Sequence, residues 1–249
     1  MGGRKEDCSV RFYEWREAII SVFFPRHCPV CEDIVQPRGE LICPDCVKEL
    51  SPVKQPVCFG CGKELESDLM EYCFDCSKRP HTFKRNFALL NYNEAASNSM
   101  VSIKYRNRRE YLDFYGRALC VKYGKMIARI SPDILVPVPV HSSRMRIRGF
   151  NQAQILAEIM GEILGIPVCG DVLKRSKKTA PQKELNPQER LKNLEQAFEA
   201  GKLPEGVKSV LVVDDIYTTG STLEACARVL KRMGVENIYG ITICVGEMA

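Results

Sequence analysis

Two adjacent aspartates, Asp214 and Asp215, stand between an apolar run and a stretch of small hydroxyl residues in VLVVDDIYTTGST, residues 210–222. Where a strand turns into a helix, backbone amides and hydroxyls of such a stretch can hold an anion, and the helix N-terminus adds to the attraction. The carboxylates would repel a phosphate but accept hydrogen bonds from vicinal hydroxyls. The segment therefore predicts a ligand with a diol and a phosphate, as in a 5-phosphorylated ribose. The anion would lie on Thr218, Thr219, Gly220, Ser221 and Thr222.

Two other kinds of protein carry a strand that ends in acids, but the chain lacks the residues that would complete either of them. A receiver domain begins with such a strand and requires a phosphorylatable aspartate one strand later, whereas no aspartate follows Asp215. A Walker B strand holds Mg²⁺ with an acid but requires a G-x-x-x-x-G-K-[ST] loop, which is absent from the sequence. Both interpretations are weak, and a structural role for Asp215 in a turn or helix cap remains the plainer alternative.

Arginines cluster after an earlier apolar run, in VPVPVHSSRMRIRGFNQA of residues 136–153. Guanidinium groups bind phosphate oxygens through paired N–H donors, so Arg144, Arg146 and Arg148 can hold a diphosphate. A solvated basic face is the alternative interpretation and is as well supported as ligand binding for Arg146.

Eight of the thirteen cysteines form an internal repeat in which each unit reads C-x2-C-x11-C-x2-C. Four thiolates satisfy one tetrahedral zinc ion and leave no coordination position for water. The spacing predicts two structural zinc ions, paired within each repeat as the first choice. A crossed pairing, redox dithiols and an iron–sulfur site are the alternatives. The ligands would be Cys28, Cys31, Cys43 and Cys46, then Cys58, Cys61, Cys73 and Cys76.

The balance of charge differs between the cysteine-rich N-terminal part and the rest of the chain. Residues 1–80 carry 11 Lys and Arg against 14 Asp and Glu, whereas residues 81–249 carry 25 against 17. The acidic balance favours a structural or protein-docking zinc module over one that contacts nucleic acid, which remains the alternative. We therefore predict an N-terminal helix and double zinc ribbon in 1–80 and a second domain in 81–249.

Apolar segments and helical patterns alternate after residue 83. Strands that are apolar throughout and separated by helices predict an α/β domain with a parallel sheet and helices on both faces. Ligands of such sheets bind at the carboxyl ends of the strands, where the acid pair is expected. Strands are expected over 87–92, 133–138, 167–168, 207–213 and 238–245, and helices over 12–24, 96–106, 110–130, 151–164 and 220–233.

No apolar run is long enough to cross a membrane, and the N-terminus lacks the pattern of a signal peptide. Cysteines grouped as metal ligands are typical of a reducing compartment, in which the scattered thiols act as small core residues. We expect a cytoplasmic protein. Residues 12–24 are expected to pack on the ribbons, with docking to a partner at the inner face of the membrane as the alternative.

The acid pair and its loop closely resemble the 5-phosphoribosyl-1-pyrophosphate (PRPP) signature of type I phosphoribosyltransferases. The resemblance implies that fold, Mg²⁺ bound together with PRPP, the two aspartates on the ribose hydroxyls, and residues 218–222 on the 5-phosphate. It places the pyrophosphate loop after an earlier strand, and residues 174–193 at the position of the loop that closes over the reacting ribose. These placements imply a catalytic role for Arg190 beside the acids, and diphosphate contacts for His141, Ser142, Arg144 and Arg148.

The cysteine module, VPVPVH and RGFNQA, KTAPQKELNPQERLKN and VLVVDDIYTTGST together resemble the ComF family, in particular its ComFC branch, along nearly the whole chain. Lys104-Tyr105-Arg106 resembles the family as well, which implies a PRPP contact for Lys104. The family implies a role in natural competence and DNA uptake, the passage of incoming single-stranded DNA into the cytoplasm. Shorter relatives carry one cysteine quartet rather than two, so the partner of the N-terminal module stays open.

Three functions remain in view. The first is a PRPP-binding protein that handles single-stranded DNA on the basic face of 81–249, with a protein partner on the zinc ribbons. The second is an active phosphoribosyltransferase of nucleobase or nucleotide metabolism, whose acceptor the sequence does not identify. The third is a regulator that senses PRPP without turnover.

Overall fold

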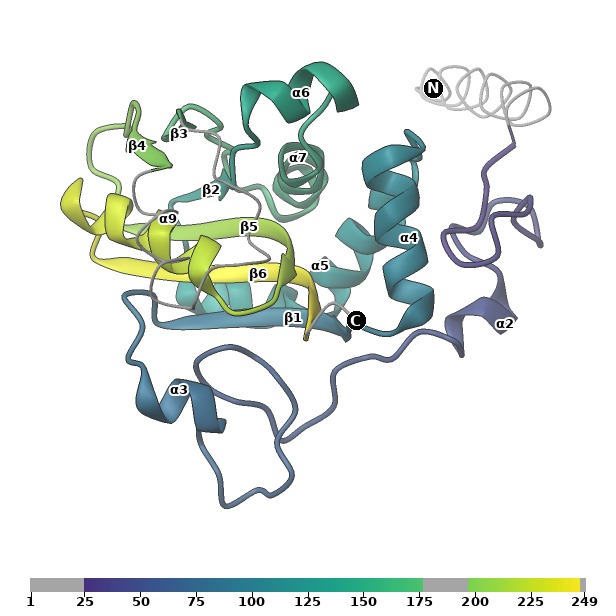
Figure 1. Ribbon diagram of the computed structural model, residues 1–249, viewed down its shortest axis with the longest axis horizontal. Coiled ribbons are helices and arrows are strands. Elements are labelled where there is room, and N and C mark those ends of the chain that lie inside the picture. The colour runs from purple at the N-terminus through teal and green to yellow at the C-terminus, as the bar shows by residue number, and fades with distance from the viewer. Residues whose placement is uncertain (1–24, 177–196, 247–249) are drawn as a thin grey trace, which may run out of the picture.

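The computed structural model describes residues 25–176 and 197–246, and its centre is a parallel sheet (Figure 1). The strand order is β1-β6-β5-β2. Leu135 of β2 also forms an isolated parallel bridge with Val168, which is all that forms of the strand predicted over 167–168. The strands are β1 (Arg85–Asn91), β2 (Ile134–Pro137), β5 (Ser209–Tyr217) and β6 (Asn237–Val245).

Helices cover both faces of this sheet, so the predicted α/β architecture is confirmed. One face packs against α4 (Glu94–Tyr105), α5 (Tyr111–Ile130) and α7 (Gln152–Leu164). The other packs against α9 (Ser221–Arg232) and a small antiparallel hairpin of β3 (Leu173–Arg175) and β4 (Phe198–Ala200). The sequence indicated the four long helices, but it did not indicate the hairpin or the short helix α6 (Ser142–Arg148).

Asparagine residues set where two of the long helices begin. The side chain of Asn93 accepts a hydrogen bond from the amide of Ala96 at 3.0 Å, and Asn151 accepts one from Ala153 at 3.1 Å. Each bond satisfies an amide that has no partner inside the helix. The caps thereby fix the first turns of α4 and α7, the helices that carry Lys104 and Gln152.

The two cysteine units repeat in three dimensions as they do in sequence. The amide of Cys28 donates to Asp33 O at 2.7 Å, and the amide of Cys58 donates to Lys63 O at 2.8 Å. Each unit ends in a short helix directly after its third cysteine, α2 (Pro44–Val47) or α3 (Phe74–Lys78). The predicted duplication is therefore confirmed. We call residues 25–50 the first ribbon and residues 56–79 the second.

The chain between the ribbons lies along the outer edge of the sheet. Val53 donates its amide to Leu89 O at 3.0 Å, Asn91 donates to Ser51 O at 2.7 Å, and Pro52 pairs with Leu90 of β1. These bonds occupy the backbone groups that an edge strand otherwise leaves exposed. The ribbons lie beside β1 at this edge (Figure 1).

Each ribbon adds its buried side chains to one of the two cores of the sheet. Val35 and Leu50 of the first ribbon belong to the cluster under α4 and α5, whereas Val57 and Cys76 of the second ribbon belong to the cluster under α9. The two modules therefore share their cores, and the boundary at residue 80 stays a prediction about sequence modules.

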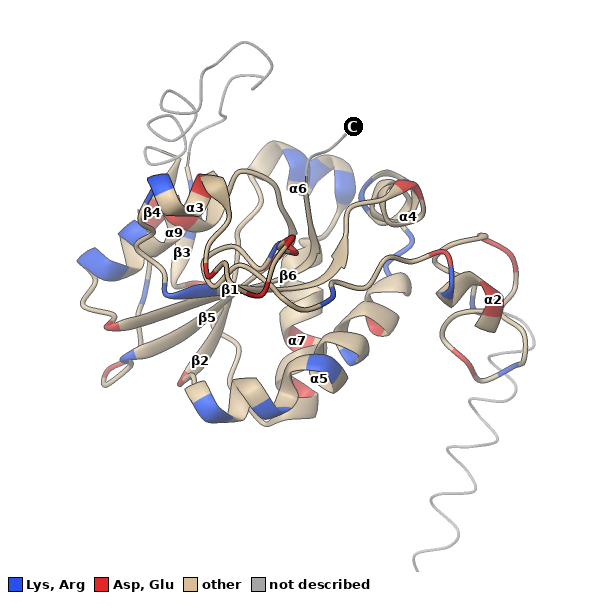
Figure 2. Cartoon of the chain, turned by 90° about the horizontal axis from the view of Figure 1, so that it is seen from below, with Lys and Arg blue, Asp and Glu red and all other residues tan. Residues whose placement is uncertain are grey.

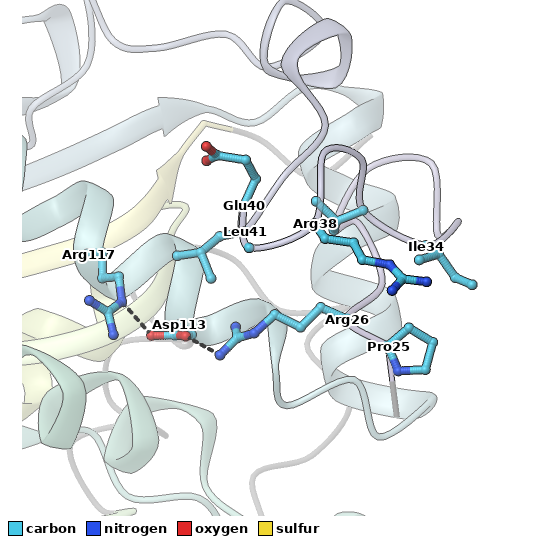
Figure 3. A pocket seen from close by; sticks show the side chains of 10 residues that line it. Pro25, Arg26, Ile34, Arg38, Glu40, Leu41, Asp113 and Arg117 are labelled. Carbon is cyan, nitrogen blue, oxygen red and sulfur yellow. Dashed lines mark hydrogen bonds and ion pairs between the residues drawn. The ribbon is translucent and has the colours of Figure 1, made fainter. Parts of the chain in front are cut away.

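A cavity of about 530 Å³ lies between the first ribbon and α5, away from the acid pair (Figure 3). Asp113 of α5 closes one side of it by pairing with Arg26 at 2.7 Å and with Arg117 at 2.8 Å. Pro25 stands at its rim, and the helix predicted over 12–24 lies outside the described residues. Among the helices of 25–176 and 197–246, none combines the length and the apolar character needed to cross a membrane.

Candidate functional site

The acid pair lies inside strand β5 rather than at its end. The strand was predicted to stop at Val213, but its ladder with β6 continues through Asp214 opposite Thr242 to Tyr217 opposite Val245. The prediction was wrong because Ile216 and Tyr217 favour extended backbone and Tyr217 is buried, which keeps the strand paired. The strand therefore ends four residues later than expected, whereas α9 begins only one residue later, and the short turn between them lies beside Asp214.

Asp215 is held by side chains from two helices on one face of the sheet. Lys104 of α4 forms an ion pair with Asp215, and both side chains are largely buried, at 19% and 9% exposure. Gln152 of α7 donates its Nε2 hydrogen to Asp215 Oδ1 at 3.3 Å and accepts a hydrogen bond from Arg148 on its Oε1. The structure thus brings together Lys104, Arg148 and Asp215, and it joins them through Gln152, which the sequence did not single out.

The two acids differ in how readily they take a proton. Burial raises the pKa of Asp214 well above its ordinary value, and the charge of Asp215 raises it further. Burial acts on Asp215 in the same direction, but Lys104 and the hydrogen bonds outweigh it, so the pKa of Asp215 is lowered. Asp215 therefore stays ionised beside Lys104, while Asp214 is the acid whose charge depends on pH and on what binds next to it.

The predicted anion-binding residues form the turn from β5 into α9, and we call Thr218–Thr222 the phosphate loop. Asp214, Thr218, Gly220 and Thr222 border one small hollow. Gly220 precedes the first residue of α9 with φ 75°, and Thr219 and Ser221 join their hydroxyls at 2.9 Å. The first amides of a helix lack intrahelical acceptors, so those at the start of α9 are available to an anion. The arrangement sets the N-terminus of α9 beside the carboxylate of Asp214.

Gly220 is required by both its backbone conformation and its packing. A Cβ atom at this position would lie 2.1 Å from the Tyr217 hydroxyl oxygen, in a left-handed conformation that side chains disfavour. Gly220→Ala should therefore lower the free energy of unfolding by about 3 kcal/mol in urea denaturation. Gly206→Ala is the matched control, because Gly206 has φ 80° and open space around it. Its expected loss is about 1 kcal/mol, and equal losses would show that the Tyr217 contact carries no weight.

The residues expected on a diphosphate lie on α6, which follows β2, or directly before it. The His141 ring contacts its own backbone, since Nδ1 accepts a hydrogen bond from the amide of Ser143 at 3.1 Å. Ser142 and Arg144 are exposed. Arg148 is partly buried, with its guanidinium 5.7 Å from the centre of the Tyr105 ring. Arg148 therefore lies near the acid pair, and Arg144 faces the solvent. His141 serves as the N-cap of α6.

Arg175 is a further basic residue at the site that the sequence did not single out. It lies on β3, where burial lowers its pKa, the charge of Arg144 lowers it further, and the charge of Asp214 opposes both. Only its place after the apolar pair Val172-Leu173 distinguishes it in the sequence. The loop expected over 174–193 begins differently from the prediction, because Lys174 and Arg175 pair with β4 as part of strand β3. The rest of that loop, with Arg190, lies outside the described residues.

Each cysteine quartet gathers within its own repeat, as predicted. In each quartet the four Sγ atoms lie within 4.8 Å of one another. Four thiolates at that spacing fit one tetrahedral zinc ion and leave no position for a water, which is the donor set of a structural site. The remaining described cysteines agree with the expectation of core residues, since Cys120, Cys226 and Cys244 are buried and Cys169 is partly buried. Cys8 lies outside the described residues.

Two family models match the chain. The model described as "Double zinc ribbon domain" matches residues 19–77, and the model described as "Phosphoribosyl transferase domain" matches residues 124–247. The first match covers both cysteine quartets, and the second covers the acid pair, the phosphate loop and α6. The likeness to known domains thus falls on the same two modules that the cysteine repeat and the parallel sheet define.

Curated relatives match between 43% and 67% of the chain. Competence protein F of Haemophilus influenzae is 38% identical over 109 residues, which are 43% of this chain and 48% of that protein. The DNA utilization protein YhgH of Salmonella typhi is 30% identical over 172 residues, 67% of this chain and 74% of the relative. Competence protein ComFC of Bacillus subtilis is 28% identical over 155 residues, 61% of this chain and 60% of the relative. The chain thus belongs to the ComF family, with a double zinc ribbon joined to a phosphoribosyl transferase domain.

Proposed function

We propose that the site binds PRPP or another 5-phosphorylated ribose. The observation that carries this proposal is the common hollow bordered by Asp214, Thr218, Gly220 and Thr222, which sets a carboxylate beside a helix N-terminus. A phosphate on the loop leaves the ribose hydroxyls facing the acids, whose oxygens accept hydrogen bonds from a diol. Arg148 supplies positive charge near Asp215 and Arg175 near Asp214, and the charge of Arg144 reaches both arginines. Positive charge at this place suits a ligand with a second phosphate group.

Mg²⁺ fits this proposal through oxygen donors. The carboxylate of Asp214 and the phosphates of the ligand are the kind of oxygens that Mg²⁺ prefers, whereas Asp215 is already engaged by Lys104. When bound, the ion would neutralise charge on a diphosphate. The residues of the chain would orient the ribose and shield it from solvent.

A calorimetric titration with four ligands tests the proposal. Ribose 5-phosphate and PRPP with Mg²⁺ should bind, whereas ribose and inorganic phosphate should each bind at least about 100-fold more weakly, because each engages only half of the site. Thr222→Val should weaken ribose 5-phosphate binding without affecting the zinc content. Equal affinity for inorganic phosphate and ribose 5-phosphate would contradict the proposal, since the acids would then have no role.

The raised pKa of Asp214 predicts that Asp214→Asn stabilises the fold while it weakens ligand binding. An aspartate whose pKa is raised on folding contributes stability below its unfolded pKa of about 3.9 and loses that contribution as the pH rises through the folded value. At about pH 8 the asparagine variant should therefore be more stable by about 1 kcal/mol. Its ribose 5-phosphate affinity should fall at least about tenfold. The wild-type affinity should rise with pH as Asp214 ionises, and the affinity of the variant should lack this rise.

Thermal denaturation and titrations across a pH series measure both effects. A variant that is less stable than the wild type at high pH would contradict the assignment of a carboxylate with a raised pKa to this position. A wild-type affinity that does not change with pH would show that Asp214 does not contact the ligand.

The same pocket serves a transferase or a sensor of PRPP, and one assay distinguishes them. A transferase releases pyrophosphate from PRPP as a nucleobase adds to C1, so release should depend on a particular base. A sensor binds PRPP without that release. Asp215→Asn should abolish release in the first case, and in the second case it should change binding alone.

We further propose that single-stranded DNA binds beside this pocket, on the basic face formed by the end of α4 and by α6. Tyr105 is 74% exposed and Ile147 is 86% exposed, so both offer apolar surface for stacking or packing of bases. Figure 2 shows the Lys and Arg positions along α6, next to the end of α4. Exposed rings among cations suit single strands, which are held through phosphate charge and base stacking. The names of the relatives, competence protein and DNA utilization protein, agree with such a ligand.

Charge reversal tests the basic face. Arg144→Glu/Arg146→Glu should weaken binding of a single-stranded oligonucleotide and flatten its dependence on salt, by about 0.7 in the logarithmic slope for each phosphate that is no longer neutralised. Lys125→Glu/Arg129→Glu changes charge equally on exposed positions of α5, near the opposite end of the sheet. Equal loss in the two variants would show only general attraction, and no binding by the wild type at low salt would refute the proposal.

For the zinc ribbons we propose a protein partner with a basic, amphipathic surface. The second ribbon exposes large apolar side chains, with Leu69 at 95% and Phe74 at 69% exposure. Acids surround them in the sequence at Glu66, Asp68 and Glu71. Exposed apolar groups with a charged rim are typical of docking surfaces, and the acids favour a cationic partner.

A helical peptide with one leucine face and one lysine face is a suitable probe for this surface. Leu69→Ser/Phe74→Ser should weaken its binding, whereas Val121→Ser, at an 88% exposed position on α5, should leave the binding unchanged. Unchanged binding in the double variant would refute the docking surface.

A further inference from the structure

One histidine, two residues after the second ribbon, lies between that ribbon and α9, the helix that follows the phosphate loop. His81 places Nε2 3.3 Å from Cys76 Sγ, a member of the second cysteine quartet, and Nδ1 3.7 Å from a carboxylate oxygen of Glu224. The side chains of His81 and Glu224 are shielded from solvent, at 15% and 8% exposure. A zinc ligand and the first turn of α9 are therefore linked by a single imidazole ring.

Glu224 in turn fixes the beginning of α9. It accepts hydrogen bonds from the Thr82 amide at 2.9 Å and from the Thr82 hydroxyl at 2.6 Å, and Arg228 donates to it at 2.9 Å. Its own amide donates to Gly220 O at 2.8 Å, inside the phosphate loop. The residues directly after the second ribbon thus hold the helix N-terminus that would receive the phosphate.

Stacked rings provide a second connection from the same histidine. The His81 ring stacks on Phe83 with centres 4.4 Å apart, and Phe83 meets the Tyr217 ring edge-on at 6.4 Å. The Tyr217 hydroxyl packs so closely against Gly220 that no Cβ fits between them. Because rings in a packed interior cannot move independently, a shift of His81 would reach the loop along this path as well.

A buried asparagine links the quartet to the hollow itself. Asn86 Nδ2 donates to Cys61 O at 3.0 Å and to the Thr242 hydroxyl at 3.2 Å, and the side chains of Asn86 and Thr242 are buried. Thr242 borders the hollow together with Asp214. The first ribbon contacts a different helix. Its Glu32 accepts hydrogen bonds from Ser102 of α4 and from Arg106, the residue directly after α4.

We propose that the second cysteine quartet positions the phosphate loop, with His81 as the positioning residue that joins the metal-bound thiolate to Glu224. A metal ion bound to Cys76 would fix the position of its Sγ atom. The His81 ring, which lies between Cys76 and Glu224, would then have a fixed contact on one side and would keep Glu224 in place on the other. The phosphate loop is then shaped before a ligand arrives, which removes ordering that binding would otherwise require. The ligand part of this inference rests on the proposed ribose phosphate function, while the shaping of the loop does not.

Hydrogen exchange of the backbone amides in residues 218–224 tests the positioning role without any ligand. His81→Ala should raise their exchange rates about tenfold, because it removes both the contact with Glu224 and the stacking on Phe83. His81→Gln, which keeps a side-chain donor, should restore part of the protection. His27→Ala is the matched control in the first ribbon, where His27 contacts Arg108 at 3.3 Å, and it should leave these amides unchanged.

Two further measurements keep the outcomes distinct. Native mass spectrometry should find two zinc ions per chain in His81→Ala, so that loosening of the loop is not loss of metal. If that variant loses metal, Glu224→Gln breaks the link from the α9 side and should raise the same exchange rates with both ions retained. Ribose 5-phosphate affinity should fall about tenfold in either variant.

Unchanged exchange in residues 218–224 for both His81→Ala and Glu224→Gln would overturn the proposal. Absence of ribose 5-phosphate binding by the wild type would refute the proposed ligand alone, since the exchange measurement would still decide whether the quartet positions the loop.

Discussion

Lys104→Met is expected to lower the free energy of unfolding by about 3 kcal/mol, because it leaves the buried carboxylate of Asp215 without its cation. The methionine side chain fills similar space, so the loss reflects charge rather than packing. Asp215 keeps its hydrogen bond from Gln152 and the nearby positive charge of Arg148, which limit the loss of stability. Urea denaturation monitored by circular dichroism measures the effect.

Removing both charges should recover most of this stability. Lys104→Met/Asp215→Asn leaves no uncompensated buried charge, so its free energy of unfolding should return to within about 1 kcal/mol of the wild type. The double variant should nevertheless fail to bind ribose 5-phosphate. Equal destabilisation in the single and double variants would mean that the two side chains do not act as a pair.

Loss of either metal is expected to have the largest effect on the whole chain. Structural zinc sites contribute about 10–16 kcal/mol in small zinc-finger peptides, which is similar to the total stability of an ordinary domain. Because the ribbons share both cores with the sheet, we expect Cys28→Ser and Cys58→Ser to lower the melting temperature of the sheet as well as that of the ribbons. Circular dichroism of the sheet and zinc content measure the two sides of this prediction.

Cys120→Ser is the matched control for the cysteine variants. Cys120 is buried on α5, away from both quartets, and burial raises the pKa of its thiol to about 11. Its replacement should leave both zinc ions bound and lower the free energy of unfolding by only about 1 kcal/mol. A sheet that melts at the wild-type temperature after the ribbons have lost their metal would refute the shared core.

The acid pair, the phosphate loop and the zinc ligands could be located from sequence because each is a local pattern. Asp214 and Gly220 lie within seven residues of each other, and the cysteines repeat at a fixed spacing. Gln152 and Arg175 could not be located, because what distinguishes them is a contact with a residue far along the chain. His81 shows the same limit, since its meaning depends on Glu224, which is 143 positions later.

The fold was predicted best where burial alone decides it. The β1 and β6 segments are apolar runs on a covered sheet, and their predicted limits differ from the observed ones by at most two residues. The β3–β4 hairpin was missed because each of its strands has three residues, too few for any periodicity. The end of β5 was misplaced because the charges of the acid pair looked like the end of a buried strand.

Residues 51–53, which lie along β1, determine what would happen if the ribbons were lost. A chain that began at residue 81 would keep the acid pair, the phosphate loop and α6. It would, however, leave the backbone groups of β1 that now pair with residues 51–53 unpaired at the edge of the sheet. Such an edge invites pairing between molecules, so the shortened protein should aggregate even where its pocket is intact. A relative that dispenses with the ribbons would therefore need another segment along β1 to remain monomeric at the concentrations found in a cell.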